Sequence, residues 1–156
     1  MIAYLGKDRK HVTPSMTATH ATVTGLAARS GHVGHTLYIG NFFSSPASFD
    51  DLHTTKKHCC GTVRPNRKWM LMNSGHKTKM KSGDLKTKVK GNLTATVWKD
   101  KQNVNILTNL HSPPLEDNFC DEHGKAMKPA IIQNCNRYTG YVAKSDCIMN
   151  SYSISR

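Results

Sequence analysis

The sequence predicts a mixed α/β fold, and three local patterns support this prediction. A short apolar run at residues 36–39 is followed by the start of a helix at Ser45. Two alternating runs within residues 85–98 meet at Gly91, which is typical of a β-hairpin. Apolar residues after Pro129 have the spacing of one helix face. The chain has 156 residues, which is enough for one ordinary domain or for part of a larger one.

The first part of the chain gives the weakest signals. Residues 1–5 alternate weakly and predict a short strand. Residues 15–29 carry Val23 and Leu26 among many threonines and alanines. Threonine restricts its own χ1 rotamers and competes for backbone hydrogen bonds, so we expect only a poor helix in this segment.

The next part predicts a strand and then a helix. Residues 36–39 indicate a buried strand. Ser45 can cap the following helix, and Pro46 suits its first position, where a backbone N–H would have no partner in the helix. Charged residues expected to suit the two ends of this helix are Asp50 and Asp51 at its start and Lys56 and Lys57 at its end. The side chains expected in the core here are Phe42, Phe43, Phe49 and Leu52.

The rest of the chain predicts an antiparallel sheet followed by helix. The elements expected, in order, are a strand at 60–63, an exposed connector at 70–82, hairpin strands at 85–90 and 93–98, a strand at 104–108 and a loop at 111–128. Lysines alternate along the first hairpin strand, so we expect them to face outward. Two helical segments complete the prediction: one begins at Pro129, and the other holds Tyr141, Val142 and Ile148.

Positive charge is concentrated in the middle of the chain. The sequence has 22 Lys and Arg against 10 Asp and Glu, a net charge of +12, and its mean hydropathy is −0.53. Residues 56–101 hold thirteen of the basic residues and only two acids, Asp84 and Asp100. Such a block attracts polyanions, of which nucleic-acid phosphate backbones are the commonest. A solvated basic loop with no ligand is the alternative interpretation.

Several classes of protein are excluded or disfavoured. No apolar run approaches the roughly 20 residues of a membrane helix, and the charged start does not suit a signal peptide. The five cysteines are an odd number, which favours reduced thiols. Cys120 and His123 have the spacing of half a zinc site, although no second pair completes it. The sequence contains no nucleophile elbow, no phosphate-binding glycine loop and no dinucleotide-binding motif.

Several segments in a fixed order carry further information. They include TLYIGNFF from residue 36 and CGTVRPNRKW from residue 60, and they lie at 36–52, 60–69, 83–86, 95–101, 107–109, 111–114, 128–132, 136–142 and 150–154. Together these segments resemble the catalytic domain of piggyBac-type transposases and their host-domesticated derivatives. The resemblance covers most of the chain.

This resemblance implies a truncated RNase H-like core with an antiparallel β insertion. Residues 1–63 would form a partial core without the first catalytic strand. Residues 64–128 would form the basic antiparallel β insertion and its loop. Residues 129–156 would form the helical C-terminal part of the core, also truncated. A core without its central strand leaves sheet edges exposed, so marginal stability is expected.

The resemblance also implies that the catalytic site is incomplete. The family holds divalent metal, Mg²⁺, with three aspartates that are often helped by a fourth acid. The first aspartate would precede this chain, and the next two positions are occupied by Gly40 and Ala143. Only Asp146 matches an acid of the family site. One carboxylate cannot position two divalent ions, so we expect no catalytic residue, no metal site and no cofactor.

The leading hypothesis is therefore a catalytically inactive, truncated transposase-derived protein with at most residual DNA binding. The alternatives are a domesticated DNA-binding module and a fragment that pairs with a related transposase chain. DNA contact would be non-specific, and neither a membrane nor a small-molecule substrate is expected. The resemblance implies a nuclear location; without it, a cytoplasmic location is expected. The candidate DNA-contacting residues are Arg64, Arg67, Lys68, Lys77, Lys79, Lys81, Lys86, Lys88 and Lys90.

Overall fold

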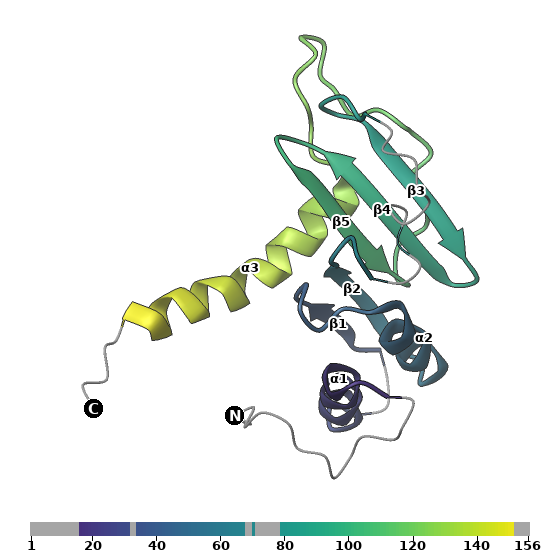
Figure 1. The fold of residues 1–156 in the computed structure, drawn as a ribbon, viewed down its shortest axis with the longest axis vertical. Helices are drawn as coiled ribbons and strands as arrows, with labels where there is room; N and C mark the ends of the chain where they lie inside the picture. Colours follow the sequence, from purple (N-terminus) through teal and green to yellow (C-terminus); the bar gives the residue numbers. More distant parts are fainter. Residues whose placement is uncertain (1–15, 32–33, 68–69, 71–78, 152–156) are drawn as a thin grey trace.

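The structure, a computed structural model, describes residues 16–31, 34–67, 70 and 79–151 (Figure 1). On the last helix, the side chains of residues 142, 143 and 145–151 lie outside this description. The strand predicted at residues 1–5 and most of the connector predicted at 70–82 also lie outside the described residues. Met70, which the connector prediction placed at the surface, is buried.

The described elements form one five-stranded mixed sheet with three helices. Their bounds are α1 (Ala18–Ala28), β1 (Thr36–Ile39), α2 (Pro46–Thr54), β2 (His58–Thr62), β3 (Leu85–Lys90), β4 (Leu93–Lys99), β5 (Asn103–Thr108) and α3 (Ala130–Ser151). The strands lie in the order β1-β2-β5-β4-β3. β1 and β2 are parallel, whereas every other neighbouring pair is antiparallel. No described helix is long and apolar enough to cross a membrane.

Each face of the sheet has its own apolar cluster. On one face, Val23 of α1 and Phe49 of α2 pack with side chains of β2, β4 and β5. On the other face, Ile132 of α3 packs with Cys60 and Trp98. The sheet is therefore covered by α1 and α2 on one side and by the first turns of α3 on the other. Figure 1 shows α3 continuing away from the sheet beyond these turns.

The prediction of a poor helix at residues 15–29 was wrong. The side chain of Thr17 caps α1 by accepting a hydrogen bond from the backbone N–H of His20. The hydroxyls of Thr22 and Thr24 donate to carbonyls four residues earlier, at 2.9 and 3.1 Å, while the helix continues. These threonines bond within the helix instead of competing with it, and burial of Val23 supplies tertiary packing that intrinsic propensity does not include.

The predicted start of α2 is confirmed, but its charges lie elsewhere than expected. Ser45 Oγ accepts from the N–H of Ser48 at 3.2 Å, and Pro46 is the first helical residue. No acid lies in the first turn, so Asp50 and Asp51 are too far along the helix to act at its N-terminus. Lys57 is buried and bonds to the end of α1 instead of α2.

The predicted core residues of this region separate into two groups. Phe49 and Leu52 are almost fully buried, as expected, and Phe43 packs against the same cluster. Phe42 is 46% exposed, so its predicted place in the core was wrong. It stands in the turn after β1, where the chain has already left the sheet.

The hairpin and the third antiparallel strand are confirmed. Lys90 of β3 is paired with Leu93 of β4, which leaves a two-residue turn. Gly91 has φ +53°, a left-handed conformation that suits the first position of such a turn and that glycine adopts without strain. The loop at 111–128 runs back along the start of β3, where the N–H of Leu85 donates to the carbonyl of Asp117 at 2.7 Å.

The C-terminal part differs from the two segments predicted. It is one continuous helix of 22 residues, α3, that includes Gly140. A single glycine in a helix lowers its stability without ending it. The division into residues 1–63, 64–128 and 129–156 stays a prediction. The sheet itself is continuous across the first boundary, because β2 pairs with β5.

Candidate functional site

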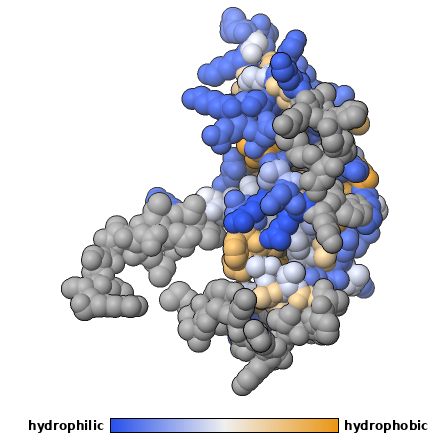
Figure 2. Space-filling model, in the orientation of Figure 1, coloured by the Kyte–Doolittle hydropathy of each residue, from blue (hydrophilic) through white to orange (hydrophobic). Residues whose placement is uncertain are grey.

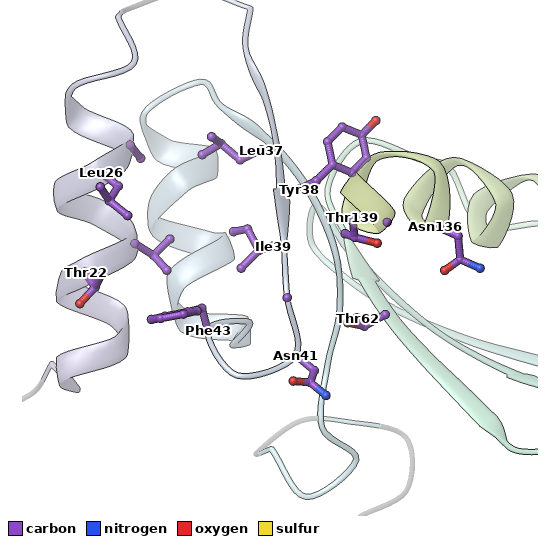
Figure 3. A pocket seen from close by; sticks show the side chains of 14 residues that line it. Thr22, Leu26, Leu37, Tyr38, Ile39, Asn41, Phe43, Thr62, Asn136 and Thr139 are labelled. Atoms are coloured by element: carbon purple, nitrogen blue, oxygen red, sulfur yellow. The ribbon is translucent and has the colours of Figure 1, made fainter. Parts of the chain in front are cut away.

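A cleft of about 810 Å³ lies beside β1, between α1 and α3 (Figure 3). Its wall on one side comes from α1 and on the other from α3, and β1 with the following turn lies between them. The lining is mostly apolar. The lining residues are Thr22, Val23, Leu26, Ala27, Leu37, Tyr38, Ile39, Gly40, Asn41, Phe43, Thr62, Asn136, Thr139 and Gly140.

Gly40, which occupies the second of the predicted family acid positions, directly follows β1 and opens into this cleft. Its carbonyl accepts backbone hydrogen bonds from Phe43 and Ser44, both at 3.1 Å, which form the turn. A Cβ placed on Gly40 would meet no other atom within 4 Å. The position therefore has room for a side chain, but glycine supplies none.

Ala143 and Asp146, the other two family positions, lie on α3. Their side chains are outside the described part of the structure. The same helix contributes Thr139 and Gly140 to the cleft that Gly40 lines. The fold thus brings the end of β1, which Gly40 follows, and α3 to one cleft.

The described lining of the cleft does not fit a divalent metal. Mg²⁺ is usually held through one or two carboxylates, yet the lining offers only amide, hydroxyl and backbone oxygens. Within the described residues, no three His, Cys, Asp or Glu side chains are grouped as metal ligands. The nearest candidates in sequence, Asp50 and Asp51, lie on α2, and Asp51 Oδ2 is 2.7 Å from His20 Nε2.

Two of the candidate DNA-contacting residues meet at Phe42. The guanidinium of Arg64 lies 5.4 Å from the centre of the Phe42 ring. Arg67 Nη2 donates to the backbone carbonyl of Phe42 at 2.9 Å. Both arginines come from the turn after β2, so this contact joins it to the turn after β1. The sequence prediction placed Phe42 in the core and therefore missed its contacts with the two arginines. The local signal for these contacts is an aromatic residue two positions after Gly40.

Lysines form a second basic group along β3. Lys86, Lys88 and Lys90 are exposed and alternate along one face of this edge strand. Successive residues of this kind are about 6.6–6.8 Å apart along a strand. Their cross-strand partners on β4 are buried, so the lysine side chains extend from the rim of a packed sheet face. The prediction that they face outward is confirmed.

The two basic groups flank the same short loop. This loop joins β1 to α2. Arg64 and Arg67 contact Phe42 within the loop, and Lys88 and Lys90 line a small hollow with Pro46, where the loop ends and α2 begins. Figure 2 shows hydrophilic side chains over much of the visible surface at the β3–β5 end. Of the other candidates, Lys79 and Lys81 are exposed just before β3, and Lys68 and Lys77 lie outside the described residues.

A hydrogen-bonded group on the α3 side of the cleft was not predicted. Tyr38 OH donates to Asn134 Oδ1 at 3.4 Å, and Asn134 Nδ2 lies 2.9 Å from His111 Nε2. Tyr38 also stacks on Tyr138 of α3, with ring centres 4.4 Å apart. Burial lowers the pKa of His111, because it disfavours the charged imidazolium. Sequence spacing gives no signal for this group, because its members come from β1, α3 and the segment after β5.

The sheet order and the helices that cover it define a mixed α/β core with a helical layer on each face. A solved piggyBac transposase, in a synaptic complex with hairpin DNA, matches this chain with a TM-score of 0.72 and 22% identity. The match covers 98% of this chain and 31% of that one, so this chain spans about a third of the solved transposase's length. At this identity the likeness shows the fold alone.

The family itself is shown by sequence. A model of the family described as Transposase IS4 matches residues 1–156, and the chain belongs to this family. The predicted resemblance to piggyBac-type transposases and the predicted mixed α/β fold are therefore confirmed.

Proposed function

We propose that this chain is a non-catalytic, transposase-derived module that binds DNA without sequence preference. The observation that carries the proposal is the lysine row on β3, formed by Lys86, Lys88 and Lys90, of which the last two share a hollow with Pro46. The loop that ends at Pro46 also holds Phe42, which two arginines contact. The solved piggyBac transposase was captured with hairpin DNA, which supports a DNA partner for a chain of the same fold. The proposal includes the nuclear location expected from the resemblance.

The chemistry of the lysine row favours phosphate over base recognition. Lysine is a compact point charge on a flexible stem, and it binds phosphate without the fixed fork with which arginine reads guanine. A row with a regular spacing of about 6.6–6.8 Å presents several such charges to one backbone. Contacts of this kind position a duplex but carry no sequence information.

Absence of catalysis is the second part of the proposal. Strand cleavage by this family requires carboxylates that hold a metal pair at the scissile phosphate. Gly40 and Ala143 supply none, and the described lining of the cleft adds none. The protein is expected to leave supercoiled plasmid intact with Mg²⁺ or Mn²⁺ and cognate transposon ends. Metal-dependent nicking that persists through purification would refute this part of the proposal.

DNA binding is tested by the salt dependence of affinity for a short duplex. Each phosphate contact contributes about 0.9 to the slope of log affinity against log salt. Replacing Lys86, Lys88 and Lys90 by glutamine should weaken binding and lower this slope by about 2–3. The matched control replaces three lysines that are exposed outside the basic segment, Lys125, Lys128 and Lys144, and should leave the slope almost unchanged. Equal losses in both variants would indicate bulk charge and contradict a defined surface.

A further inference from the structure

We propose that the exposed ring of Phe42 is a stacking site for one unpaired base of a nucleic acid, with Arg64 beside it. This inference rests on the proposed DNA binding and deepens it, because it names the kind of DNA that the surface would prefer. That kind is a duplex that continues into an unpaired base, as in a single-stranded overhang. The basis is the exposure of the ring, the contacts that fix it and the positive charge around it.

The ring of Phe42 is exposed, whereas that of its neighbour packs inward. Phe42 is 46% exposed in the turn after β1, but Phe43 is partly buried and packs against the core cluster. Asn41 and Arg64, which adjoin Phe42 in sequence and in space, are exposed as well. An apolar surface that binds a protein is usually contiguous. A single ring among polar and cationic neighbours instead fits a ligand that combines a flat aromatic face with negative charge, as a nucleotide does.

Three contacts hold this ring in place. Phe43 meets it edge-on, with ring centres 5.0 Å apart and ring planes at 84°. Arg67 Nη2 donates to the backbone carbonyl of Phe42 at 2.9 Å, which ties the turn to the segment after β2. The guanidinium of Arg64 lies over the ring, 5.4 Å from its centre. Because the ring is already fixed, a ligand that stacks on it pays little additional entropy to order it.

The position of Arg64 over the ring is open to a base. Arg64 is exposed, and a cation–π contact between exposed groups is weaker than the stacking of a base on an aromatic ring. Two stacking steps need about 6.8 Å, more than the 5.4 Å between the guanidinium and the ring centre, so a base would displace the guanidinium instead of entering beneath it. The displaced guanidinium can then bind the phosphate of the same nucleotide.

The lysine row on β3 lies within reach of the same DNA strand. Phe42 and Pro46 are four residues apart, so their Cα atoms are at most about 14 Å from each other. Lys88 and Lys90 line a hollow with Pro46. About 14 Å corresponds to about four base steps of a duplex. One DNA strand can therefore place phosphates on the lysines and, a few nucleotides further along, an unpaired base on Phe42.

Stacking on a side chain requires a base with a free face. Inside a duplex both faces of a base are covered by its neighbours, so a paired base would first have to leave the stack at a cost in free energy. A base in an overhang avoids most of that cost. Every base has a π-face, so the site adds a preference for unpaired nucleotides without adding a sequence preference.

Fluorescence anisotropy with three labelled DNA probes tests this proposal. The probes share one duplex: the first has blunt ends, the second has a short single-stranded overhang, and the third has the same overhang built from abasic nucleotides. The two overhangs carry the same phosphates, so the ratio of their affinities reports the contribution of the bases. The parent chain should bind the base-bearing overhang at least about fivefold more tightly than the abasic one.

Three variants assign this ratio to one side chain. Phe42→Leu should bring the ratio to about 1, because leucine is apolar but has no π-face. Phe42→Tyr keeps an aromatic ring and should keep the preference. Tyr141→Leu is the matched control, because it removes a ring that is 70% exposed on α3, and it should leave the ratio unchanged. Thermal unfolding of each variant checks that it is folded.

The outcomes separate this inference from the proposed function. Equal affinity of the parent chain for the two overhangs would overturn the inference, while binding of the blunt duplex would leave the proposed function standing. A base preference without measurable binding of the blunt duplex would support the stacking site and contradict duplex binding. If none of the three probes binds at low salt, both fail. A preference that persists in Phe42→Leu would place the stacking elsewhere and would also overturn the inference.

Discussion

The side-chain amine of Lys57 donates a hydrogen bond to the backbone carbonyl of Ala27, thirty residues earlier in the chain. The same amine lies 3.0 Å from Ser30 Oγ, and Lys57 is only 7% exposed. Ala27 is near the end of α1, where backbone carbonyls have no partner within the helix and carry partial negative charge. Lys57 follows α2, so this single side chain fastens the end of one helix to the next.

Replacing Lys57 by methionine should lower the free energy of unfolding by about 1–3 kcal/mol, because the carbonyl of Ala27 and Ser30 Oγ would lose a buried charged donor, while Ala27 keeps its bonds from Ser30. Methionine keeps the length of the stem, which limits the loss of packing. Urea unfolding at neutral pH measures the change. Lys56→Met is the matched control, because Lys56 is the exposed neighbour with the same charge. A comparable loss in both variants would contradict the role given to the hydrogen bonds of Lys57.

Stability should also fall as the pH drops below neutrality, because of His111. Tyr38 OH donates to Asn134 Oδ1, so Asn134 presents Nδ2 to His111 Nε2, which must accept and hence be unprotonated. The pKa of His111 is lowered in the folded state, so the unfolded chain binds the proton first. Stability is then complete above the ordinary pKa of histidine and is lost as the pH falls from there toward the lowered pKa.

Urea unfolding at pH 7.5 and pH 5 checks this dependence. His111→Gln removes the titrating group, so this variant should lose less stability between the two conditions than the parent chain. His123→Gln, at an exposed position, serves as the control and should behave like the parent. An identical pH dependence in all three proteins would exclude His111 as its source.

Thiol reactivity should differ strongly between two cysteines. Burial raises the pKa of Cys59 to about 12, because the thiolate loses its hydration, whereas Cys120 is exposed. Brief treatment with iodoacetamide at pH 8 should label Cys120 and spare Cys59, as mapped by mass spectrometry. Both should react in urea. Rapid native labelling of Cys59 would mean that β2 opens much more easily than its burial indicates.

Local sequence patterns predicted the elements that depend on local chemistry. The cap at Ser45, the turn at Gly91 and the alternating lysines of β3 each follow from neighbouring residues, and each is confirmed. α1 was underestimated because its stability comes from packing of Val23 on the sheet, which a propensity argument does not include.

The candidate site could be predicted only in part. The resemblance identified Gly40, and the structure shows that it opens into a cleft with α3. The contacts of Phe42 with Arg64 and Arg67 join two turns that are far apart in sequence, and no spacing rule connects them. The buried place of Lys57 was missed for a related reason, because its partners belong to another helix.

The two glycines at the ends of neighbouring strands should respond oppositely to substitution. Gly40→Asp should leave the melting temperature almost unchanged, since a Cβ there meets no other atom within 4 Å. Gly61→Ala should destabilise the fold by about 1–3 kcal/mol, the usual effect of overpacking. A Cβ at Gly61 would overlap the backbone carbonyl of Ile39 and lie 2.9 Å from Ser44 Oγ, and a backbone group in a paired strand cannot move aside.

Thermal unfolding of both variants beside the parent chain measures this contrast. Gly40→Asp also restores one family carboxylate to the cleft, yet one added acid beside Ala143 does not complete a metal pair. Under the proposed function, neither this variant nor the parent chain is expected to cleave DNA with Mg²⁺, while both stay folded. A large loss of stability in Gly40→Asp would show that the turn after β1 depends on glycine itself. Glycine at this position would then have a structural reason of its own.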